Sequence, residues 1–85
     1  GARLAYVNTN GAGDTIEVTI NGTSLGAITR GADQQAFANN VDAAIKSKAS
    51  LAGLTTTTST NGIDIVETNG QRIVGAKEGS SLDFR

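Results

Sequence analysis

Residues 15–28 read TIEVTINGTSLGAI, and this stretch decides the fold that we expect. Polar and apolar residues alternate strictly from Thr15 to Ile20, as they do in a β-strand with one buried face. Asn21-Gly22 is the pair that most easily adopts the positive φ angles of a type I′ hairpin turn. The pattern predicts a β-hairpin whose apolar faces coincide, with three cross-strand pairs: Ile20 with Thr23, Val18 with Leu25, and Ile16 with Ala27.

The Asn-Gly pair also occurs elsewhere, at Asn10-Gly11, Asn61-Gly62 and Asn69-Gly70. Leu54–Thr60 is nearly pure threonine, which is β-branched and suits a pleated strand that touches water. The last two Asn-Gly pairs connect this run to two more strand-like segments, Ile63–Thr68 and Gln71–Ala76. We therefore expect a three-strand meander with three further cross-strand pairs: Glu67 with Arg72, Val66 with Ile73, and Ile65 with Val74.

One helix is expected between the two hairpin regions, from Asp33 to Lys48, with its end near Ala49 or Ser50. The Asp33 carboxylate can cap the helix by accepting a hydrogen bond from the backbone N–H of Gln35 or Ala36. Asp42 and Lys46 form an i,i+4 ion pair in the better orientation. Five residues share the stripe that faces the sheet: Phe37, Val41, Ala44, Ile45 and Lys48.

The expected fold class is α+β, with a small, mostly antiparallel sheet of Asn-Gly hairpins and one helix packed on one face. Residues 1–85 suit a single domain. Leu4–Val7 should form a first strand, after which Asn8–Asp14 reads as a loop. In the tail, Leu82 and Phe84 could return to the core; if the chain is inserted in a larger protein, Leu82–Phe84 should lie beside the first strand, so that the two ends form a two-stranded stem. The chain contains no Met, which suggests a fragment, a processed product or an excised domain.

The chain contains neither His nor Cys, which excludes imidazole bases, thiolate nucleophiles and ordinary zinc sites. The eight carboxylates are dispersed, and those of Asp14, Asp33, Asp42 and Asp64 suit a loop, a cap or a solvated face. We predict no catalytic, cofactor-binding or metal-binding residue, no cofactor and no enzymatic activity.

Two polar stretches need a separate reading. Asn10–Asp14 is glycine-rich, but a phosphate cradle lies between a strand and a helix, whereas a strand follows here. It also lacks the ligand spacing of a calcium loop. Thr55–Thr60 could accept O-linked glycans, although a solvated strand is the simpler interpretation.

The formal net charge is −1 and no Lys/Arg cluster is present. The electrostatic basis for binding nucleic acid or an anionic membrane is therefore missing. No apolar stretch is long enough to span a bilayer. We expect neither nucleic acid nor a membrane as a partner.

Thr15–Gly70, from TIEVTINGTSLGAI through ADQQAFANNVDAAIKSK to GIDIVETNG, resembles the flagellin "IN" motif. This repeat occurs in the variable region of flagellins and in the filament-cap protein. The abundant Thr, Asn, Ala and Gly, with few aromatic residues, are similar to the composition of flagellin outer domains. The terminal heptad helices that polymerise a filament core are absent.

The resemblance implies a structural, surface-exposed module of the bacterial flagellar filament, inserted in a larger filament protein and secreted to the cell exterior. It would space and decorate the filament surface. Its partners would be neighbouring copies and the remainder of the parent chain. The alternatives are a module of the filament-cap protein, or a small extracellular adhesive or binding domain of a phage or an adhesin.

Overall fold

Seven strands, one α-helix and one 3₁₀ turn make up the parts of the chain that the computed structural model describes, residues 2–6, 11–67, 76–78 and 82–84. In chain order they are β1 (Ala2–Tyr6), β2 (Thr15–Ile20), β3 (Thr23–Thr29), α1 (Gln34–Lys46), η1 (Ala49–Leu51), β4 (Leu54–Ser59), β5 (Gly62–Glu67), β6 (Ala76–Glu78) and β7 (Leu82–Phe84). The predicted α+β class, with one helix and antiparallel strands, is confirmed.

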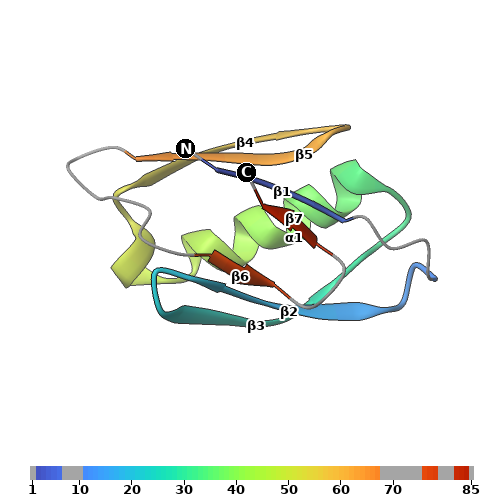
Figure 1. Cartoon of the computed structure of the whole chain (residues 1–85), viewed down its shortest axis with the longest axis horizontal. Coiled ribbons are helices and arrows are strands. Elements are labelled where there is room, and N and C mark those ends of the chain that lie inside the picture. Colours follow the sequence, from blue (N-terminus) through green and yellow to red (C-terminus); the bar gives the residue numbers. More distant parts are fainter. Residues whose placement is uncertain (1, 7–10, 68–75, 79–81, 85) are drawn as a thin grey trace.

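The strands form two sheets, whereas a single sheet was predicted. The first sheet has the order β4-β5-β1-β7 and the second has the order β3-β2-β6. All neighbouring strands run antiparallel. Figure 1 shows the first sheet, with β4 and β5, at the top and the second sheet, with β2 and β3, at the bottom, with α1 between them. The helix contacts β3 of the second sheet as well as β1, β4 and β5 of the first, so it packs against both sheets.

The core lies where the helix meets the two sheets. Phe37, Val41 and Ile45 of the predicted stripe are buried, Ala44 is partly buried, and Ala38 is buried as well. The strands add apolar side chains from both sheets: Leu4, Ile16, Val18, Ile20, Leu25, Ile28, Ile63 and Ile65. The described residues include no buried polar or charged residue.

The β2–β3 hairpin has the predicted turn but only part of the predicted register. Asn21 and Gly22 have φ angles of 52° and 78°, as a type I′ turn requires. Ile20 pairs with Thr23 as predicted. Farther along, Ile16 pairs with Ile28 and not with Ala27, because two residues of β3 stand opposite Val18 and form a β-bulge.

The bulge consists of Leu25 and Gly26, and Gly26 has a φ angle of 77°. It changes which side chains of β3 face the core. Leu25 and Ile28 are both buried although they lie three residues apart, whereas Ala27 is exposed. A regular strand would have buried Ala27 in place of Ile28.

The β4–β5 hairpin turns one residue earlier than predicted. Ser59 pairs with Gly62, so the two loop residues are Thr60 and Asn61 instead of Asn61 and Gly62. Gly62 is the first residue of β5 and has a φ angle of 114°. A Cβ atom there would overlap the carbonyl oxygen of Leu4 in β1. Glycine is therefore required by the close approach of β1 as well as by the backbone angle.

The predicted meander is wrong, because both sides of β5 are occupied by other strands. Ile65 pairs with Thr56 of β4 on one side and with Ala2 of β1 on the other, so Val74 cannot be its neighbour. The predicted pairs of Glu67 with Arg72 and of Val66 with Ile73 fall on residues 68–75, outside the described residues. Ala76, the predicted end of the meander, begins β6, which pairs with β2 in the other sheet.

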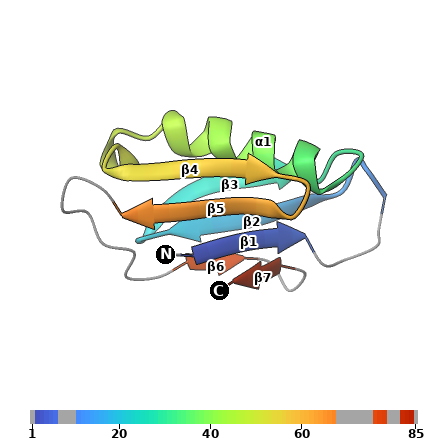
Figure 2. The ribbon, with the colours of Figure 1, turned by 90° about the horizontal axis from the view of Figure 1, so that it is seen from above.

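The predicted pairing of the two ends is confirmed. β1 and β7 are antiparallel neighbours, with Leu4 opposite Phe84 and Tyr6 opposite Leu82. In Figure 2 the start of β1 and the end of β7 lie beside each other at one corner of the first sheet.

The helix begins as predicted and ends earlier. The backbone N–H of Ala36 donates to the carboxylate of Asp33 at 2.9 Å. The last helical residue is Lys46, and Ser47 caps the end by donating its hydroxyl to the carbonyl of Ala44 at 2.7 Å. The chain then forms η1 and buries Leu51, which an unbroken helix to Ser50 would not have placed against the core.

Candidate functional site

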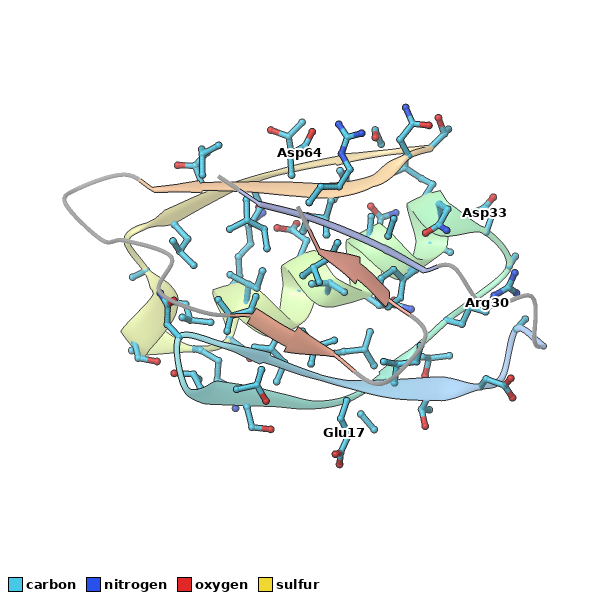
Figure 3. All side chains as sticks on the ribbon, in the orientation of Figure 1. Glu17, Arg30, Asp33 and Asp64 are labelled. Atoms are coloured by element: carbon cyan, nitrogen blue, oxygen red, sulfur yellow. The ribbon has the colours of Figure 1, made fainter. Side chains whose placement is uncertain are left out.

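Three of the carboxylates weighed in the sequence have structural partners at separate places. Asp33 caps α1, Asp42 joins α1 to β4, and Asp64 pairs with Arg3. Figure 3 shows Asp64 above the first sheet and Glu17 below the second, on opposite outer faces. Among the described residues, no group of three or more His, Cys, Asp or Glu side chains could hold a metal ion.

The Arg3–Asp64 ion pair links β1 to β5 across the outer face of the first sheet. Arg3 stands directly opposite Asp64 in the ladder, and its guanidinium donates to both carboxylate oxygens, at 2.7 and 3.1 Å. The hydrogen bonds from Arg3 hold the pKa of the Asp64 carboxyl below its usual value. Both side chains remain more than 40% exposed, so the pair orients the two strands more than it stabilises them.

Asp42 accepts hydrogen bonds from two sides and ties the helix to a sheet. The ammonium of Lys46 lies 2.9 Å from one carboxylate oxygen, as the i,i+4 spacing predicted. The hydroxyl of Thr56 in β4 donates to the other oxygen. Partial burial raises the pKa of Asp42, but the hydrogen bonds from Thr56 and Lys46 outweigh it and leave the pKa lowered.

The threonine-rich strand β4 has two different faces. Thr55 and Thr57 are exposed on the outer face, whereas Thr56 and Thr58 are half-buried on the inner face toward α1. Val66 stands opposite Thr55. Its side chain is 45% exposed, and among the described residues it is the large hydrophobic residue that is exposed. The outer face of the first sheet therefore presents hydroxyl and methyl groups at Thr55, Thr57 and Val66 beside the Arg3–Asp64 ion pair.

The glycine-rich loop before β2 uses its backbone groups internally. The N–H of Asp14 donates to the carbonyl of Gly11 at 3.1 Å. The carbonyls of Ala12 and Asp14 accept from the N–H groups of Gly31 and Arg30, at 2.9 and 2.8 Å. In the described residues 11–14, these contacts extend the β2–β3 hairpin.

A pocket of about 300 Å³ opens beside β4 at the end of the helix. One wall comes from the end of α1 and from η1: Ile45, Lys46, Lys48, Ala49, Leu51 and Ala52. The other wall is Leu54 and Thr56 of β4. Two lysines therefore stand over an apolar floor that includes the buried Ile45 and Leu51.

Sequence reasoning missed the Arg3–Asp64 pair, the Thr56–Asp42 hydrogen bond and the pocket. Arg3 and Asp64 are 61 positions apart, and Thr56 and Asp42 are 14 apart. Each contact depends on which helices and strands pack together, which no local pattern specifies. The Asp42–Lys46 pair lies within one helix and could be predicted.

No family model matches the sequence, and no similarity to a curated protein or to a solved structure was found. Of the described residues, none belongs to a helix with the length and apolar character needed to cross a bilayer.

Proposed function

We propose that this chain is a structural, surface-exposed module of a bacterial flagellar filament protein, a flagellin variable domain that spaces and decorates the filament surface. The observation that carries the proposal is the antiparallel pairing of β1 with β7, with Leu4 opposite Phe84. An inserted module must leave and rejoin its host at one place, and paired ends satisfy that demand.

The similarity of Thr15–Gly70 to the flagellin "IN" motif directs the proposal to a filament protein. The open outer face of the first sheet, with exposed Thr55 and Thr57, supports a role at a surface in contact with water. A free-standing adhesive or binding domain makes no demand on where its ends lie, so the terminal pairing favours an insert.

Gold-labelled antibody against residues 1–85 tests the proposal on intact cells that carry the full-length protein. A flagellin module predicts label along the whole length of the filaments. Label confined to the filament tip would assign the chain to the cap protein. Label on the cell body or on phage particles would contradict the filament role. A strain lacking these residues controls for the specificity of the antibody.

A further inference from the structure

The outer edge of β4 presents unpaired backbone groups of the first sheet. β4 pairs with β5 through an uninterrupted ladder that ends at the Ser59–Gly62 pair, across a two-residue loop. That closing pair exchanges both of its hydrogen bonds, and hydrogen-bonded pairs then alternate along the ladder. Leu54, Thr56 and Thr58 therefore direct their N–H and C=O groups away from β5. No other hydrogen bond between described residues reaches these backbone groups.

The edge of the second sheet at β3 is protected, unlike the edge at β4. The Leu25-Gly26 bulge interrupts β3. The hydroxyl of Ser24 accepts from the N–H of Gly26 at 3.1 Å, and the side-chain amide of Asn40 donates to the carbonyl of Thr29 at 2.9 Å. A bulge twists an edge away from strand addition, and the two side-chain hydrogen bonds occupy backbone groups of β3. β4 has no bulge, charge or proline, so it lacks these protections.

The pocket adjoins this open edge. Its strand wall consists of Leu54 and Thr56, two of the residues whose backbone groups point outward. A segment that paired with β4 would alternate its side chains between the two faces of the sheet. Those on the inner face would lie over the pocket, whose floor includes Ile45 and Leu51. An edge that offers backbone groups beside a side-chain pocket is the arrangement by which β-strand addition recognises peptides.

We propose that the β4 edge and the adjoining pocket form a docking site for an extended peptide segment of another protein chain. The segment would add a strand to the first sheet and place an apolar side chain in the pocket and a carboxylate near Lys48. This site does not depend on the filament role proposed above.

The charges of the pocket select an acidic segment. Its walls carry Lys46 and Lys48 and no carboxylate. The ammonium of Lys46 already binds Asp42, which lies next to the pocket and neutralises that charge locally. Lys48 is therefore the cation that a carboxylate of the docked segment would meet.

A bare extended segment suits this edge better than a second copy of this chain does. Figure 2 shows α1 projecting beyond β4 on the side away from β5, and Figure 1 shows that α1 lies at a lower level than the first sheet, between the two sheets. An added strand would lie over α1, and the helix would cover its inner face. An antiparallel β4–β4 dimer would bring a second α1 to the same face of the joined sheet, next to the first. An extended segment without a helix behind it brings no second helix to that face.

The capped peptide TLTETLT, which carries its Leu and Glu side chains on one face, tests the proposal by NMR-detected amide exchange. We expect the peptide to slow exchange at Leu54, Thr56 and Thr58 and to leave Thr57 unchanged, since the Thr57 amide already binds β5. A version with N-methylated backbone amides should not bind. Binding without protection at these amides, equal binding of the N-methylated peptide, or no binding at millimolar concentration would each overturn the proposal.

Two variants test the edge and the pocket separately. T58P removes an outward N–H without removing a bond to β5, so the chain should fold and lose the peptide. K48E should reverse the charge preference. Wild type should bind TLTETLT about fivefold more tightly than TLTKTLT, and K48E should prefer TLTKTLT by a similar factor. An unchanged preference in K48E would contradict the assigned role of Lys48, even if T58P fails to fold.

Discussion

Phe37 is the largest fully buried side chain among the described residues, and it lies on the helix that contacts both sheets. Its surroundings are aliphatic side chains from α1 and the strands, which form one contiguous cluster. Tyr6 and Phe84 are the other aromatic residues of the chain. Among the side chains whose burial the structure describes, Phe37 is therefore the aromatic ring of the core.

Phe37→Ala should lower the free energy of unfolding by about 3–5 kcal/mol, because it leaves a cavity between the helix and the sheets. That loss is a large share of the total stability of about 5–15 kcal/mol that a small domain has. Urea denaturation followed by circular dichroism measures it. Asn39→Ala, on the exposed side of α1, should change stability by less than about 0.5 kcal/mol. Similar small effects from both variants would show that Phe37 does not face the core.

Gly62 is held in place by its backbone angle and by the adjacent carbonyl of Leu4, whereas Gly22 is constrained by its angle alone. Gly22→Ala should cost about 1–2 kcal/mol for the left-handed conformation. Gly62→Ala should cost at least about 3 kcal/mol, because β1 must also move. Gly11→Ala is the matched control, with open space and no positive φ angle. In thermal unfolding, Gly11→Ala should lose the least stability, Gly22→Ala more and Gly62→Ala the most. Equal losses at Gly22 and Gly62 would contradict the close approach of β1.

Burial along the helix could be predicted from the sequence, because the side chains of Phe37, Val41 and Ile45 repeat at helical spacing. The requirement at Gly62 was predicted for a different reason. A positive φ angle was expected there from an Asn-Gly turn, but the turn lies one residue earlier and the glycine accommodates β1. Glycine was correctly expected at position 62, because the predicted turn and the observed close approach of β1 both require glycine.

At the scale of elements, α1 is attached to the edge strands of both sheets by polar contacts. Asn40 donates to the carbonyl of Thr29 at the end of β3, and Asp42 accepts from Thr56 in β4. β2 was predicted with its observed bounds because its alternation is strict. The bulge in β3 could not be predicted in this way. The apolar residues Leu25, Ala27 and Ile28 fit a regular strand that buries Leu25 and Ala27 as well as they fit a bulged strand that buries Leu25 and Ile28.

The contact between α1 and β4 should make stability depend on acid pH. The pKa of Asp42 is lowered in the folded chain, so its ionised form stabilises the fold. That contribution is complete above the unfolded pKa of about 4 and is lost as pH falls through the lower, folded pKa. Asp42→Asn should therefore destabilise by about 1 kcal/mol or less at pH 7 and by less at pH 2.

Urea unfolding at both pH values measures this difference, and the carboxyl resonance of Asp42 reports its pKa directly. Asp64 also has a lowered pKa, from Arg3, so Asp64→Asn serves as the matched control on the opposite face of the sheet. Thr56→Val should raise the pKa of Asp42 without affecting Asp64. A pH dependence that is the same in wild type and Asp42→Asn would show that Asp42 does not contribute.

At the scale of the whole molecule, the chain alternates between the two sheets. β1 belongs to the first sheet, the β2–β3 hairpin to the second, the β4–β5 hairpin to the first, β6 to the second and β7 to the first. Both hairpins are local and could be predicted from turn residues. The pairing of β1 with β5 joins positions about 60 residues apart and has no local signal, which is why β5 was assigned to a meander.

If the module is an insert in a filament protein, removing residues 1–85 from the parent chain should leave filament assembly intact. The paired ends allow the host to close across the gap, because the two points of attachment are neighbouring strands. Electron microscopy of filaments from the deletion strain measures assembly, and loss of antibody binding confirms the altered surface. Failure to form filaments, with the parent chain still exported, would contradict an accessory role.

The β1–β7 pairing also sets how tension passes through the molecule. If the chain is an insert, a host that is stretched pulls on the two ends of this chain, and those ends meet in a ladder of three residue pairs. The force acts directly on this ladder, and β1 passes part of the load to β5, its other neighbour in the first sheet. Pulling the ends apart opens an antiparallel pair of this kind like a zip, one pair at a time. The β1–β7 ladder would therefore be the first part of the fold to open under such a load.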